Sequence, residues 1–112
     1  MAQSGSKHWK SHRVTALLLI PASLLFLYPF INSFGGSQSD VLITYANPVN
    51  AMIALLFFGT LSVHLYQGLH EVIVDYAHSG FWLRILHLCN ALFSALLGIA
   101  AFIAIARIAL FP

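Results

Sequence analysis

The sequence predicts an all-α integral membrane protein with three transmembrane helices. Of its 112 residues, 60% are hydrophobic and only 7% are charged, whereas an ordinary soluble domain carries about 25% charged residues. A soluble chain of this size keeps much of its surface in water and could not hide so much apolar material. The apolar residues form three long runs, at 14–34, 48–74 and 82–110. Each run is long enough to cross the hydrocarbon, which takes about 20 helical residues.

The first predicted helix covers residues 14–34. It is followed by Gly35-Gly36-Ser37, whose residues tolerate the backbone angles that end a helix. Pro21 and Pro29 lie inside the run, and each removes a helical hydrogen bond, so we expect them to kink the helix. The run is longer than the apolar core of a signal peptide, which has roughly 7–15 residues. We therefore expect this helix to be retained.

Local signals delimit the second and third predicted helices. Asn47 is a good N-cap and Pro48 suits the first helical position, so the second helix is expected over 48–74. A short turn, His78-Ser79-Gly80, precedes the third helix at 82–110. None of the runs alternates with period two, as the strands of a membrane barrel would. In the third helix, small residues recur at a spacing that permits close helix packing: Ala91, Ser94, Ala95, Gly98 and Ala101.

Basic residues predict the orientation in the membrane. The N-terminal segment and the loop between the second and third helices hold Lys7, Lys10, Arg13 and Arg84. The other side holds Arg107. Because basic residues stay on the cytoplasmic side, the N-terminus and the 75–84 loop are expected in the cytoplasm and the C-terminus outside. Residues 35–47 then form the outer loop.

The expected organisation is a cytoplasmic N-terminal segment, residues 1–13, followed by a single three-helix membrane domain, residues 14–112. The basic residues are a topology signal and do not favour nucleic acid as a partner. Cys89 is the single cysteine and lies in an apolar run, so neither a disulfide framework nor a paired-cysteine metal site is expected.

His64 carries the functional hypothesis, because an ionisable side chain inside the membrane is costly and needs a partner. At about 100° per residue, Gly68 and Asp75 lie about 40° and 20° from it on one helix face, with Asp75 about 16 Å further along. Neutral imidazole is a good axial ligand for haem iron, and a glycine one turn away would let a flat porphyrin approach. Alternatively, His64 is hydrogen-bonded to a serine or a carbonyl on a neighbouring helix. Spacing alone leaves both interpretations open and offers no convincing second axial ligand.

The stretch His64-x3-Gly68-x6-Asp75-Tyr76 resembles the second helix of the smaller, D-type hydrophobic membrane anchor of succinate dehydrogenase, respiratory complex II. This anchor is part of the cytochrome b component of that complex. The run Arg13-Val14-Thr15-Ala16 at the start of the first helix belongs to the same resemblance. Length, three spans and the inferred orientation match over most of the chain.

The resemblance implies a role for each matched position. His64 would be one axial ligand of haem b, with the other histidine supplied by the larger, C-type anchor subunit. Gly68 would lie beside the porphyrin, and Arg13 would approach a haem propionate. Tyr76 would hydrogen-bond a ubiquinone carbonyl oxygen, and Asp75 would support the quinone site. Apart from the haem iron, no metal site is implied.

The resemblance also implies partners. A flavoprotein subunit with FAD would oxidise succinate, and an iron–sulfur subunit would pass the electrons to ubiquinone, so this chain is a non-catalytic subunit by itself. The expected location is the bacterial cytoplasmic (inner) membrane, with the mitochondrial inner membrane as the alternative. Three rival interpretations stay open: an anchor of a quinol:fumarate reductase, a subunit of another b-type cytochrome complex, and a cofactor-free structural membrane subunit.

Overall fold

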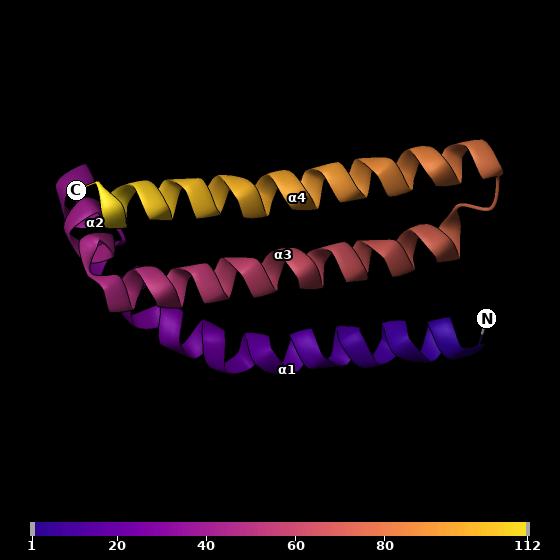
Figure 1. The fold of residues 1–112 in the computed structure, drawn as a ribbon, viewed down its shortest axis with the longest axis horizontal. Coiled ribbons are helices and arrows are strands. Elements are labelled where there is room, and N and C mark those ends of the chain that lie inside the picture. The colour runs from indigo at the N-terminus through magenta and orange to yellow at the C-terminus, as the bar shows by residue number, and fades with distance from the viewer. Residues whose placement is uncertain (1, 112) are drawn as a thin grey trace.

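The computed structural model describes residues 2–111, with side chains described for residues 9–111. Four helices follow one another: α1 (Ala2–Ser33), α2 (Gln38–Ala46), α3 (Pro48–Tyr76) and α4 (Gly80–Leu110). The long helices α1, α3 and α4 run side by side in an open layer, with α3 in the middle (Figure 1). Each is antiparallel to its neighbour, so the N-terminus and the α3–α4 turn lie at one end of the layer, while α2 and the C-terminus lie at the other (Figure 1).

The three long helices have the surface of a membrane protein. Their candidate spans, Trp9–Ser33, Pro48–Tyr76 and Gly80–Leu110, are long and apolar enough to cross a membrane. Most of their large apolar side chains face outward, whereas polar side chains such as Gln67 and Asn90 are buried between helices. Lipid favours this distribution, because a hydrogen-bonding group in hydrocarbon needs a partner from the protein itself. The predicted all-α fold with three spans is confirmed.

Most of the predicted helix ends are also confirmed. After α1, Gly35 adopts the left-handed backbone with a φ of 77°, which glycine takes without steric cost. The side chain of Asn47 caps α3 by accepting a hydrogen bond from the backbone N–H two residues on, at 2.9 Å. Pro48 begins that helix, as expected. Residues 77–79 form the turn into α4.

The start of α1 differs from the prediction. The helix begins at Ala2, so residues 2–13 continue the first helix ahead of the membrane span predicted from residue 14. Extending a helix that already exists fixes one residue for each new hydrogen bond, which is far cheaper than starting a helix. Pro21 and Pro29 both lie inside α1, and the helix bends in its second half (Figure 1).

A short helix, α2, lies within the segment expected to be an outer loop. Ser37 Oγ accepts a hydrogen bond from the Asp40 backbone N–H at 3.3 Å, and Asp40 Oδ2 accepts one from the Ser37 backbone N–H at 2.9 Å. This reciprocal pair is a capping box, which satisfies two N–H groups at the helix start. The pattern Ser-x-x-Asp is visible in the sequence and could have predicted α2.

Aromatic packing joins the helices at the α2 end of the layer. Phe26 of α1 stacks on Phe57 of α3, with ring centroids 4.5 Å apart and planes 3° from parallel. Phe26 also faces Tyr45 of α2, with centroids 6.4 Å apart. Beside these rings lies a small buried core that includes Ala54 of α3 and Ile105 of α4. Aromatic pairs add about 0.5–1.5 kcal/mol beyond area burial, so this end is firmly held.

Small residues let α4 approach α3 closely. A Cβ placed at Gly98 would lie only 3.1 Å from Ser62 Oγ. Nearer the turn, buried Asn90 donates from Nδ2 to the Tyr66 carbonyl at 3.0 Å, and Ser94 Oγ donates to Asn90 Oδ1 at 3.2 Å. Gly98 and Ser94 belong to the small-residue face predicted for the third helix, which therefore packs inside this chain against α3.

Candidate functional site

His64 lies half-buried on α3, at the interface with α1. Its Nδ1 is 3.0 Å from Oγ1 of Thr15, a buried residue of α1. The imidazole thus has the polar partner that its depth in the span requires. No hydrogen bond joins His64 Nε2 to any part of the chain that the structure describes.

Thr15 connects His64 to a buried amide. Its hydroxyl donates to Gln67 Oε1 at 2.8 Å, and Gln67 in turn donates from Nε2 to Ser11 Oγ. Gln67 is only 6% exposed, so these contacts satisfy a polar group that would otherwise be costly in apolar surroundings. The result is a continuous row of hydrogen-bonded side chains from α1 and α3, which we call the Thr15 row: Ser11, Gln67, Thr15 and His64.

His12 was not among the predicted site residues, yet it lies against His64. The two ring centroids are 4.5 Å apart with planes tilted by 43°, and His12 Nδ1 is 3.2 Å from Glu71 Oε1. Gly68 faces this ring, and a Cβ there would lie 3.9 Å from His12 Nε2, at ordinary van der Waals distance. His12 shares a face of α1 with Thr15, three residues later. That spacing puts the two residues on one face of α1 but does not by itself indicate that this face meets His64.

An open cleft of about 440 Å³ adjoins this cluster. Its lining consists of Trp9, His12, Arg13, Ala16, His64 and Glu71. Arg13 Cζ lies 5.2 Å from the centroid of the Trp9 ring, a cation–π contact worth about 0.5–1 kcal/mol at an exposed site. Two predicted site residues from different helices, His64 and Arg13, therefore share one cleft.

The other predicted site residues lie further along α3. Gly68 is one turn from His64 and faces His12, as described. Asp75 and Tyr76 are the last two residues of α3, and both are exposed, Tyr76 by 83%. Neither lines the cleft at His64. The structure therefore separates a half-buried imidazole site from an exposed pair at the helix end.

Within residues 9–111, no three His, Cys, Asp or Glu side chains gather closely enough to hold a metal ion. These described residues therefore form no metal-ion site of their own.

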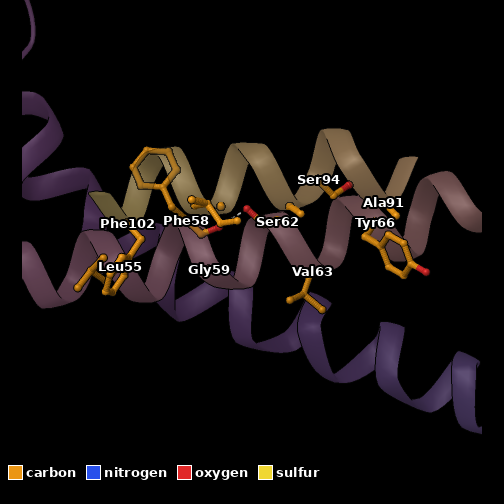
Figure 2. Close-up of a pocket in the computed structure, with 12 residues that line it drawn as sticks. Leu55, Phe58, Gly59, Ser62, Val63, Tyr66, Ala91, Ser94 and Phe102 are labelled. Atoms are coloured by element: carbon orange, nitrogen blue, oxygen red, sulfur yellow. Dashed lines mark hydrogen bonds between the residues drawn. The ribbon is translucent and has the colours of Figure 1, made fainter. Parts of the chain in front are cut away.

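A second hollow is an apolar groove of about 540 Å³ between α3 and α4. Figure 2 shows Ser62 and Ser94 between the two helices, with Tyr66 toward one end and Phe102 toward the other. Both serine hydroxyls already donate hydrogen bonds, Ser62 to the Phe58 carbonyl at 2.8 Å and Ser94 to Asn90. The groove is therefore mainly an apolar surface.

Three antiparallel spans in an open layer, with buried polar side chains and the His64 imidazole held at a helix interface, define a multi-pass helical membrane protein. The chain belongs to the succinate dehydrogenase/fumarate reductase transmembrane subunit family, whose model matches residues 1–106. The resemblance drawn from the stretch His64 to Tyr76 is thereby confirmed at the level of the family.

Two relatives give the same result. The succinate dehydrogenase hydrophobic membrane anchor subunit of Rickettsia bellii is 30% identical over 104 residues, which cover 93% of this chain and 83% of that protein. The protein of the same name from Paracoccus denitrificans is 30% identical over 79 residues, covering 70% of this chain and 61% of that protein. No solved structure matches the chain significantly.

Proposed function

We propose that this chain is a membrane anchor subunit of a succinate:ubiquinone oxidoreductase, contributing one axial ligand of haem b and part of the ubiquinone-reduction site. Membership of the family supports the enzyme class, and both relatives are named as succinate dehydrogenase anchors. The environment of His64 gives the strongest support for the haem. Its Nδ1 is engaged by Thr15, while Nε2 makes no hydrogen bond to the described residues.

The residues around His64 fit one side of a haem. A metal-bound histidine uses one ring nitrogen for the metal and donates the other N–H to a nearby acceptor, and Thr15 Oγ1 at 3.0 Å is such an acceptor. Arg13 lines the adjoining open cleft, where its guanidinium would pair with a carboxylate such as a propionate. The second axial histidine would come from the C-type anchor subunit.

When bound, haem b supplies one-electron redox chemistry within the membrane. His64 would bind the iron through Nε2, and the contact with Thr15 would fix the orientation of the ring. Arg13 would neutralise propionate charge at the membrane boundary. Gly68, which has no side chain, would let a flat ligand approach this stretch of α3, beside the ring of His12.

Tyr76 and Asp75 would form this chain's part of the quinone site. Reduction of ubiquinone takes two electrons and two protons, and the protons must come from water. The exposed Tyr76 phenol would donate a hydrogen bond to a quinone carbonyl oxygen. Exposed Asp75, beside it at the end of α3, would relay protons from the aqueous boundary. The iron–sulfur subunit and the C-type anchor would complete the site.

The open layer of helices supports an assembly with partners. Because α1 and α4 both pack on α3, their outer faces carry many exposed apolar side chains, which helices of the C-type anchor and lipid would cover. The flavoprotein, with FAD, and the iron–sulfur subunit would lie on the side of the N-terminus and the α3–α4 turn, which we place in the cytoplasm. The Rickettsia and Paracoccus relatives support a bacterial inner membrane.

Purification of a tagged complex with Tyr76→Phe tests this function. Losing one hydrogen bond to a neutral acceptor costs about 0.5–1.5 kcal/mol, which lowers kcat/KM for ubiquinone roughly 2- to 13-fold. Succinate oxidation by an artificial acceptor that bypasses quinone should not change. Tyr28→Phe is the matched control, since Tyr28 is an exposed tyrosine of α1. Unchanged quinone kinetics would remove Tyr76 from the site, and a complex without flavoprotein and iron–sulfur subunits would overturn the subunit assignment.

The family description covers fumarate reductases as well, so a quinol:fumarate reductase anchor is the second candidate. The two directions are distinguished by the ratio of succinate–quinone to quinol–fumarate turnover of the same purified complex with its native quinone.

A further inference from the structure

Thr15 Oγ1 has more polar neighbours than it has protons. It lies 2.9 Å from the backbone carbonyl oxygen of His12, 2.8 Å from Gln67 Oε1 and 3.0 Å from His64 Nδ1. A hydroxyl has one proton to donate and two lone pairs that accept. The chemistry of the three neighbours therefore decides which of them receives the proton and which must supply one.

Two of these neighbours, the His12 carbonyl oxygen and Gln67 Oε1, can only accept hydrogen bonds. The amide of Gln67 is oriented by its other end, where Nε2 donates to Ser11 Oγ. Gln67 is 6% exposed, so Oε1 without a donor would cost about 1–3 kcal/mol. The Thr15 proton is therefore directed at the oxygens.

His64 must then be the donor in its contact with Thr15. A neutral imidazole carries one N–H, so a proton on Nδ1 leaves the lone pair on Nε2. In the other tautomer, lone pairs of Nδ1 and Thr15 Oγ1 would face each other at 3.0 Å, and Nε2 would carry a proton. Only the first tautomer can bind a metal through Nε2.

We propose that Thr15 is a positioning residue that holds His64 in the Nδ1–H tautomer. The hydrogen bonds from Thr15 to Gln67 and from Gln67 to Ser11 hold the Thr15 hydroxyl in place. This role depends on the haem ligation proposed above for His64. The acceptor is a neutral hydroxyl, which polarises the Nδ1–H bond less than a carboxylate would. The hydrogen bond therefore raises the basicity of His64 Nε2 only moderately. Loss of the hydroxyl should therefore change both haem retention and haem potential.

The purified complex with Thr15→Val tests the proposal, since valine keeps the shape of threonine and removes the hydroxyl. Thr15→Ser keeps the hydroxyl and is the rescue variant. Thr44→Val is the matched control, because Thr44 Oγ1 donates at 2.7 Å to a carbonyl of its own helix, α2, at the far end of the layer. The readouts are haem content per flavin, haem midpoint potential and the electron paramagnetic resonance spectrum of the oxidised haem.

Thr15→Val should bind haem about 10- to 100-fold more weakly, the usual effect of losing a hydrogen-bond partner of a metal ligand, with a shifted midpoint potential. Thr15→Ser and Thr44→Val should match the wild type. If the complex with Thr15→Val does not assemble, Thr15→Cys replaces it in the test and should show the same weaker haem binding. A thiol is nearly isosteric with the serine hydroxyl but is a weak hydrogen-bond acceptor.

The outcomes separate this proposal from haem ligation itself. An unchanged haem affinity, potential and spectrum in Thr15→Val, or in Thr15→Cys, would overturn the role of Thr15 if His64→Ala still removes the haem. Haem that is retained unchanged in His64→Ala would instead refute ligation by His64.

Discussion

The contact between Gly98 and Ser62 should control how closely α4 packs on α3. In Gly98→Ala, the new Cβ would lie 3.1 Å from Ser62 Oγ and 3.4 Å from Ser62 Cβ. The first separation is shorter than an ordinary contact, so the Ser62 side chain or its helix must shift by a few tenths of an ångström. Alanine gains about 0.8–1 kcal/mol of helix propensity over glycine, but overpacking costs about 1–3 kcal/mol. We therefore expect a net destabilisation of up to about 2 kcal/mol.

Ser62→Ala should relieve this strain, because it removes the closer of the two atoms. Ser62 Oγ donates to the Phe58 carbonyl of its own helix, so its loss breaks no bond between helices. The assay is thermal unfolding of the purified complex for the wild type, both single variants and the double variant. Gly98→Ala should lower the stability in the wild type but not in the Ser62→Ala background, with a coupling of at least about 0.5 kcal/mol. Additive effects would refute direct packing of these two residues.

Two further predictions concern polar groups. Asn90→Ala removes the hydrogen bond to the Tyr66 carbonyl and should destabilise the complex by about 0.6–1.7 kcal/mol, whereas an unchanged melting temperature would show that Asn90 does not hold α4 to α3. Ser37→Ala removes the N-cap side chain and breaks the capping box of α2, at a cost of about 0.5–2 kcal/mol, and should speed amide hydrogen exchange in 38–46 while leaving α3 protected. Equal exchange in the variant and the wild type would mean that tertiary packing alone holds α2.

The membrane fold could be predicted from the sequence because the length of each apolar run and the residues at its ends act locally. Asn47 and Gly35 set helix ends through their own backbone and side-chain chemistry, so neighbouring helices were not needed to place them. The extension of α1 back to Ala2 was missed because polarity marks the edge of the membrane, not the end of a helix. The α2 helix was missed because its Ser37–Asp40 signal is short.

The site was predictable only in part. His64 stands out because a titratable group deep in a span is rare. The antiparallel order of the first two spans also places Arg13 at the end of the helix layer that is nearer to His64. The Thr15 row depends on how α1 is rotated about its axis against α3, and a single sequence does not fix that rotation. For the same reason, the sequence did not predict that the imidazole of His12 lies beside Gly68.

The most direct measurement is a dithionite-reduced minus oxidised visible spectrum of the tagged complex, purified gently from native membranes, for the wild type and His64→Ala. Axial ligation by His64 predicts a b-type haem signal in the wild type that is lost or shifted in the variant at equal flavin content. A wild-type complex that holds its flavoprotein and iron–sulfur subunits but no haem, or an identical signal in His64→Ala, would contradict it.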